Sequence, residues 1–146
     1  MDQTDWKILN ALQANARLSY AEIGRRVGLT PPAVAERIRK MEEAQIIEGY
    51  HAVVNLDKVS RPILAIIHVG IIDQPAGHFE KFVREHSAVL ECIKITGQEG
   101  FYMKVAVSSM TELQNLIDSL SAYSSTETAI ALATIAKRYV VERGSG

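Results

Sequence analysis

The charged side chains best suited to binding nucleic acid lie between residues 25 and 40. This stretch holds five positive residues and a single negative one, Glu36, which gives a net charge of +4. The positive residues are Arg25, Arg26, Arg37, Arg39 and Lys40. Such cations neutralise phosphates, and arginine also donates paired hydrogen bonds to a guanine edge. The cluster predicts a DNA-binding surface, although a solvated helical hairpin with a basic face would show the same charges.

Two short helices joined by a tight turn are predicted to carry these charges. Ser19 followed three residues later by Glu22 is a capping box, which marks the start of the first helix. Gly28 tolerates the positive φ at which helices commonly end, and Thr30 is a favourable N-cap for the second helix. We therefore predict a helix-turn-helix over residues 20–39.

Apolar residues at helical spacing predict how this motif is buried. The stripe shared by its two helices consists of Ile23, Val27, Val34, Ile38 and Met41. A preceding helix over residues 5–13 is expected to add Ile8, Leu9 and Leu12. Residues 46–55 have the pattern of two short strands joined at Glu48-Gly49. Residues 1–55 are thus predicted to form a winged helix-turn-helix domain.

Composition limits the class of protein. The net charge of the whole chain is −1, so the positive charge is local, which suits a module that docks one face on DNA. Cys92 lies among apolar neighbours and is interpreted as a buried residue, and no nucleophile–base pair or metal-ligand spacing stands out. We expect no enzymatic activity, catalytic residue, metal or cofactor. The polar N-terminus and the lack of a long apolar run predict a cytoplasmic protein, associated with a prokaryotic nucleoid and not with a membrane.

The hydrophobic pattern changes after residue 55. Residues 56–61 are polar and irregular and are interpreted as a hinge. Over residues 62–141, strand and helix patterns follow the ferredoxin-like order β-α-β-β-α-β, with the last strand pattern, over 127–141, expected in two pieces. Residues 142–146 are expected to form a disordered tail. The predicted class is therefore α+β, and the sheet face left open by the helices predicts a dimer.

Six short stretches, spread over nearly the whole chain, together match a known pattern. They are Asp5-Trp6-Lys7-Ile8-Leu9, Arg17-Leu18-Ser19, Val27-Gly28-Leu29-Thr30-Pro31-Pro32, Arg37-Ile38-Arg39-Lys40-Met41-Glu42, Ile46-Ile47-Glu48-Gly49-Tyr50 and Ile95-Thr96-Gly97. In this order they resemble the Lrp/AsnC (feast/famine) family of transcription regulators. The resemblance implies a winged helix-turn-helix, a ligand-sensing αβ-sandwich, homodimers that assemble further into tetramers or octamers, DNA wrapping or bending, and amino acids as effectors.

The second helix of the motif, from Thr30 onward, is expected to lie in the major groove of double-stranded DNA. Pro32 and Ala33 offer apolar contact to thymine methyl groups, and Glu36 is a candidate acceptor from a cytosine amino group. Arg37 is a candidate for a guanine contact, with a phosphate contact or an intramolecular pair with a glutamate as equal alternatives. The cations assigned to phosphates are Arg25, Arg26, Arg39 and Lys40.

The loop after residue 96 is the candidate effector site. In the family this loop usually carries acidic residues in a Gly-Asp-Tyr-Asp type sequence, which help to hold an amino acid. Here Gly97 matches, whereas Gln98 and Gly100 stand where acids are expected. Glu99 either turns inward to pair with an ammonium group or remains a solvated loop residue. The predicted effector residues are Thr96, Gly97, Gln98, Glu99, Gly100, Thr126 and Thr128.

Two functions fit these patterns. The first is a sequence-selective, amino-acid-responsive transcription regulator that binds DNA as dimers or higher oligomers. The alternative is a nucleoid-associated architectural protein that wraps DNA with little response to an effector. Comparing the salt dependence of binding to specific and random DNA separates the two.

Overall fold

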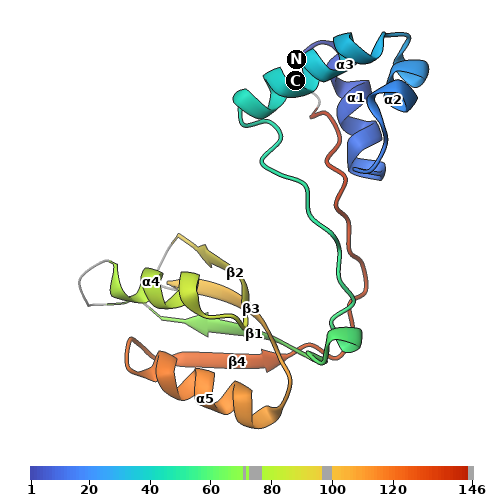
Figure 1. The fold of residues 1–146 in the computed structure, drawn as a ribbon. Helices are drawn as coiled ribbons and strands as arrows, with labels where there is room; N and C mark the ends of the chain where they lie inside the picture. Colours follow the sequence, from blue (N-terminus) through green and yellow to red (C-terminus); the bar gives the residue numbers. More distant parts are fainter. Residues whose placement is uncertain (71, 73–76, 97–99, 145–146) are drawn as a thin grey trace. The chain divides into compact units, whose positions relative to one another are not determined.

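The computed structural model describes residues 1–70, 72, 77–96 and 100–144, which form two compact units (Figure 1). The first unit comprises Met1–Ala52 together with Ala136–Gly146, and the second comprises Val53–Ile135. In the described part of the chain, no helix is long and apolar enough to cross a membrane. The predicted α+β class is confirmed.

Three helices form the first unit: α1 (Gln3–Ala14), α2 (Tyr20–Val27) and α3 (Pro31–Glu43). Their shared core consists of Ile8, Leu12, Ile23, Val34, Ile38, Met41 and Ile47. The predicted helix-turn-helix over residues 20–39 is therefore confirmed. The first helix begins earlier than expected because Asp2 is its N-cap and forms a reciprocal capping box with Asp5.

The predicted hairpin over residues 46–55 is not formed. All of these residues are described, and none lies in a strand. Instead, the amides of Ile46 and Ile47 donate to the Met41 carbonyl at 2.9 and 3.2 Å, and Gln45 takes a φ of 55°. These contacts close the C-terminal end of α3 and use backbone donors that a hairpin would need. The wing is thus corrected to a helix-terminating turn followed by extended chain.

In its described residues, the second unit contains a four-stranded sheet and two helices. Its elements are a 3-10 turn η1 (Asp57–Val59), β1 (Ile63–Val69), α4 (His78–Glu85), β2 (Val89–Lys94), β3 (Phe101–Val107), α5 (Met110–Ser121) and β4 (Thr126–Ile130). The strands lie in the order β2-β3-β1-β4, and each described pair is antiparallel. This is the predicted ferredoxin-like arrangement.

One face of this sheet is buried under the helices, and the other is open. Alternate strand residues and the inner faces of α4 and α5 make the core of this unit. It contains Ala65, Ile67, Val69, Phe79, Ala88, Met103, Val105, Val107, Leu113, Leu116 and Leu120. On the opposite face, Ile93 of β2 and Tyr102 of β3 pair with each other and are both exposed. The expected open apolar face is therefore present in the single chain.

The last predicted strand is shorter than expected. β4 ends at Ile130, and the described residues 131–144 contain no strand. Leu132 and Ile135 are almost fully exposed, so their β propensity finds no neighbouring strand to pack against. Val141 instead exchanges two hydrogen bonds with the Gln13 side chain, of 2.6 and 3.1 Å. The residues after 135 group by their contacts with the helical unit.

The segment interpreted as a hinge, residues 56–61, contains the 3-10 turn η1 and is fastened to the second unit. Arg61 Nη1 donates to the Ala106 carbonyl at 2.8 Å and lies 3.4 Å from Glu112 Oε1. Two hydrogen bonds from Ser108 lower the pKa of Glu112, with a smaller contribution from Arg61.

Gly100 lies immediately before β3, where a side chain has no room. Its φ is 70°, and a Cβ there would lie 2.4 Å from the Val69 carbonyl oxygen and 2.5 Å from that of Gly70. Both neighbours are backbone atoms, which cannot move aside without disturbing the end of β1. The acidic residue that the family resemblance leads us to expect at this position does not fit this backbone.

We expect Gly100→Ala to lower the free energy of unfolding by about 2 kcal/mol or more. Urea denaturation of the whole chain measures this change. The control is Gly144→Ala, where an added Cβ meets no atom within 4 Å. A similar stability for the two variants would show that the sheet adapts to a side chain at residue 100.

Candidate nucleic-acid interface

The turn between α2 and α3 has the geometry expected of a helix-turn-helix. Ser19 and Glu22 form the predicted capping box, and Gly28 ends α2 with a left-handed φ of 73°. Thr30 is the N-cap residue of α3, as predicted, but its side chain makes no capping hydrogen bond. Pro31 and Pro32 occupy the first positions of α3 and have no N–H to donate. The N-terminus of α3 is thus poor in backbone donors and rich in apolar surface.

Gly24 is a positioning residue that the sequence analysis missed. A Cβ at this residue would lie 2.4 Å from the Leu29 carbonyl oxygen, and the Leu29 amide donates to the Gly24 carbonyl at 3.0 Å. The turn therefore packs directly on the backbone of α2. A glycine inside a helical pattern, two turns before Thr30, was the available signal.

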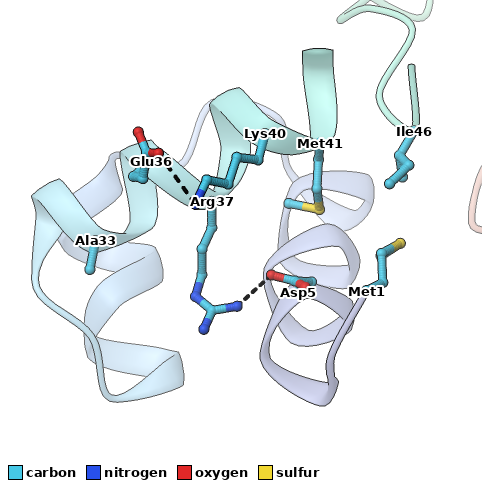
Figure 2. Close-up of a pocket in the computed structure, with 8 residues that line it drawn as sticks. All are labelled: Met1, Asp5, Ala33, Glu36, Arg37, Lys40, Met41 and Ile46. Atoms are coloured by element: carbon cyan, nitrogen blue, oxygen red, sulfur yellow. Dashed lines mark hydrogen bonds and ion pairs between the residues drawn. The ribbon is translucent and has the colours of Figure 1, made fainter. Parts of the chain in front are cut away.

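The exposed side of α3 contains four of the predicted DNA-binding residues. Ala33, Glu36, Arg37 and Lys40 follow helical spacing beside the buried stripe, and they line a hollow of about 500 Å³ (Figure 2). The other lining residues are Met1, Asp5, Met41 and Ile46. The structure therefore brings these predicted residues onto one surface.

Arg37 is held by two carboxylates of α1 and its N-cap. Its Nη1 lies 2.7 Å from Asp2 Oδ2 and 2.6 Å from Asp5 Oδ1. These hydrogen bonds raise the pKa of Arg37. The pKa of Asp2 is lowered, first by the hydrogen bond from the Asp5 amide and then by Arg37. The intramolecular pair considered for Arg37 is thus present, with aspartates in place of a glutamate.

Arg39 and Lys40 are also paired within the helix. Arg39 donates from Nε and Nη2 to the two oxygens of Glu36, at 3.0 and 2.8 Å, and its Nη1 contacts Glu43. Lys40 Nζ lies 3.5 Å from Glu36 Oε1. The hydrogen bonds from Arg39 lower the pKa of Glu36 to about 2 and raise that of Arg39. Three of the five predicted cations are therefore neutralised by neighbouring carboxylates.

Arg25 and Arg26 differ from these three. Both are exposed in the last turn of α2, and neither side chain forms an ion pair with a described residue. Their positive charge is available to an external anion. The charge that the sequence places on the whole motif is thus concentrated on α2.

The predicted effector residues are only partly described. Gly97, Gln98 and Glu99 lie outside the described residues. Thr96 follows β2, Gly100 precedes β3, and Thr126 begins β4. The pairings of Val69 with Phe101 and with Thr126 place these positions at one end of the sheet, and Thr128 lies two residues further along β4. Thr96, Gly100 and Thr126 therefore lie at one end of the sheet, and an effector site there remains a prediction.

Cys92 is half-buried in a hollow between α4 and β2. Burial raises the pKa of its thiol, which keeps the sulfur protonated and poorly nucleophilic. Cys92 is therefore half-buried and not fully buried as predicted, although it packs against the core of this unit.

Comparison with known proteins identifies both units. Residues 1–42 match the AsnC-type helix-turn-helix domain, and residues 64–141 match the Lrp/AsnC ligand binding domain. The HTH-type transcriptional regulator YezC of Bacillus subtilis is 35% identical over 134 residues, which cover 92% of this chain and 95% of that protein. The proline dehydrogenase transcriptional activator of Rhodobacter capsulatus is 34% identical over 149 residues, covering 99% and 96%.

Solved structures give the same result. The transcriptional regulator NMB0573 of Neisseria meningitidis, in complex with L-Met, superposes with a TM-score of 0.87 at 27% identity, over 97% of this chain and 96% of that one. Bacillus subtilis LrpC gives a TM-score of 0.86 at 28% identity, over 94% and 99%.

A helix-turn-helix with exposed cations, joined to a separate αβ unit, defines this chain as a DNA-binding transcription regulator and not an enzyme. The chain belongs to the Lrp/AsnC family of transcription regulators.

We expect Glu36 to make the folded state acid-sensitive. Its pKa falls from an ordinary value of 4.5 to about 2, so between these values the unfolded chain binds a proton that the folded chain does not. The free energy of unfolding therefore decreases as the pH falls through this window. Thermal unfolding followed by circular dichroism should show a melting temperature that falls less in Glu36→Gln than in the wild type.

Glu48→Gln is the matched control, because Glu48 is an exposed carboxylate without an ion pair to a described residue. This control should retain the wild-type pH dependence. Asp2, Glu22 and Glu112, whose pKa values are also lowered, contribute to the acid sensitivity that remains in Glu36→Gln. If the melting temperatures of wild type and Glu36→Gln fall equally with pH, Glu36 is not a source of the acid sensitivity.

Proposed function

We propose that this protein is a sequence-selective DNA-binding regulator that acts as a dimer or higher oligomer and responds to an amino acid. Its place in a family of transcription regulators supports the general role. The observation that carries the proposal is the contrast between α2 and α3. Free cations lie on α2, whereas the start of α3 presents an apolar surface flanked by ion-paired residues.

The surface of α3 suits base contact better than phosphate contact. In this mode Pro32 and Ala33 meet thymine methyl groups in the major groove. Thr30 adds a hydroxyl group that is not used for capping. Glu36 reaches a cytosine amino group only by exchanging its Arg39 partner, so base recognition by Glu36 is a costly alternative. Phosphate binding falls mainly to Arg25 and Arg26, with Arg39 and Lys40 in secondary roles.

This charge distribution favours a regulator over a protein that coats DNA through charge alone. A helical unit in which the cations of α3 are largely neutralised has weak sequence-independent affinity. Several linked copies of the helical unit, binding DNA together, then increase the affinity for a selected site. The open face with Ile93 and Tyr102 suits sheet-to-sheet pairing with a second copy of this chain, because an exposed apolar face is costly in water.

An amino-acid effector is proposed for the sheet end that carries Thr96, Gly100 and Thr126. The neighbouring structure NMB0573 is a complex with L-Met, and one relative is named proline dehydrogenase transcriptional activator. In this chain, hydroxyl groups and backbone replace the acid that the family pattern places at residue 100. A location in the cytoplasm, at the nucleoid, accompanies the proposed function.

The DNA-binding proposal is tested with duplexes selected by the wild-type protein from a random-sequence pool. Wild type is expected to bind the selected duplex more tightly than a random duplex. Arg25→Ala/Arg26→Ala should weaken binding to both duplexes equally and reduce the slope of log affinity against log salt by about 2, one for each lost phosphate contact. Fluorescence anisotropy over a salt series measures both quantities.

Arg39→Ala is the matched control, because it removes a cation that Glu36 and Glu43 already neutralise. Its salt slope should change by less than half as much. Absence of discrimination by the wild type would overturn sequence-selective regulation. An equally large reduction of the salt slope in Arg39→Ala would mean that the cations of α3 leave their carboxylate partners when DNA binds.

The effector proposal is tested by thermal shift with each standard amino acid. At least one is expected to raise the melting temperature, because a ligand at about 100 times its Kd adds roughly 2.7 kcal/mol to stability. Thr126→Val, which removes only a hydroxyl group, should reduce the shift, whereas the control Thr111→Val on the exposed side of α5 should not. No shift with any amino acid would remove the effector from the proposal.

A further inference from the structure

Arg37 is half-buried on α3, and its surroundings differ from those of Arg39 and Lys40, which are exposed. It lines the hollow beside Ala33 and Lys40, and about a third of its side chain is exposed, 32%. Its two ion-pair partners come from outside α3, from the N-cap and first turn of α1. These two ion pairs therefore connect α3 to the N-cap and first turn of α1.

The two carboxylates are themselves fixed. Asp2 Oδ1 accepts the Asp5 amide at 2.8 Å, and Asp5 Oδ2 accepts the Asp2 amide at 2.8 Å. Each carboxylate thus uses one oxygen in the capping box and the other on Arg37 Nη1. Neither can rotate towards solvent without breaking the cap of α1. Arg37 is anchored to a rigid acceptor pair, unlike a surface arginine that pairs with a mobile glutamate.

The anchor leaves part of the guanidinium unused. The described contacts of Arg37 involve Nη1 alone, so Nε and Nη2 donate to no described residue. Arg39 differs, because its Nε, Nη1 and Nη2 are all engaged by Glu36 and Glu43. Figure 2 shows one nitrogen of Arg37 turned to Asp5 and another turned away from it. Arg37 therefore keeps a planar pair of adjacent donors free on the side away from α1.

We propose that Asp2 and Asp5 are positioning residues for DNA recognition, which hold Arg37 so that its Nε–Nη2 edge meets a guanine in the major groove. Guanine presents N7 and O6 side by side, and this acceptor pair matches a planar arginine fork. Because the guanidinium is oriented before binding, less side-chain freedom is lost when the contact forms. The inference rests on the proposed DNA-binding function and adds to it the class of base and the residues that orient its reader.

Two simpler roles for the aspartates predict different behaviour. If the aspartates only repel the DNA phosphates, removing one carboxylate raises the affinity for selected and random DNA equally. If they only fasten α3 to α1, removing one lowers stability without changing which DNA is preferred. The informative quantity is therefore the ratio of affinities for a selected duplex and a random duplex, measured with the full chain.

The experiment compares wild type, Asp5→Asn, Arg37→Gln and the double variant by fluorescence anisotropy. The selected duplex comes from the wild-type selection, and further duplexes carry 7-deazaguanine, which lacks the N7 acceptor, in place of each guanine in turn. We expect Asp5→Asn to reduce the selected-to-random ratio by about tenfold, as for one lost base contact. In the double variant the ratio should be no lower than in Arg37→Gln, because both changes remove one contact.

Two variants serve as controls. Glu43→Gln removes a carboxylate that pairs with Arg39 on the same helix, and it should leave the ratio unchanged. Asp5→Glu keeps a carboxylate within reach of Arg37, and it should recover part of the ratio. Circular dichroism of each variant at the assay temperature confirms that the helical unit is folded. If Asp5→Asn is unfolded, Asp5→Glu is compared with wild type instead.

The outcomes are distinct. Loss of preference at one guanine in both Asp5→Asn and Arg37→Gln supports the inference. An unchanged ratio in Asp5→Asn, or losses that add in the double variant, overturns it while leaving the regulator intact. A wild-type ratio near one overturns the proposed selectivity and this inference with it.

Discussion

The ion pairs along α3 determine how much charge the helical unit offers to DNA. Arg37, Arg39 and Lys40 are matched by carboxylates from α1, its N-cap and α3 itself, so the most basic part of the sequence is close to neutral in three dimensions. The exposed charge remains on Arg25 and Arg26 of α2. Because phosphate attraction makes binding indifferent to sequence, this neutralisation supports the proposed sequence-selective binding.

The same pairs influence how α3 is held. Its buried side packs Val34, Ile38 and Met41 on the other helices, which sets the position of the helix but not the orientation of its exposed side chains. The two aspartates at the start of α1 act on that exposed side, because their capping geometry gives Arg37 a fixed partner. Gly24 adds a further constraint by allowing the turn to pack on the backbone of α2. Core packing, capping and surface charge therefore converge on one helix.

The second unit of a single chain leaves apolar surface exposed to water. Its sheet buries one face under α4 and α5 and exposes the other, and the chain after β4 carries exposed apolar residues such as Leu132 and Ile135. β propensity is a property of packed neighbours, so a strand-like sequence without a partner stays extended. The same reasoning explains residues 46–55, where the end of α3 uses the amides that a hairpin needs.

Local signals in the sequence were enough for the helix-turn-helix and the β-α-β-β-α-β order, because capping boxes, apolar spacing and glycine positions act over a few residues. The sequence also placed the predicted DNA-binding residues on α2, the turn and α3. It did not reveal that Asp2 and Asp5 hold Arg37, that Gly100 excludes a side chain, or that the strand patterns at 46–55 and 131–141 lack partners. These features depend on atoms brought together from distant positions, and only the tertiary structure decides which donors, acceptors and backbones meet.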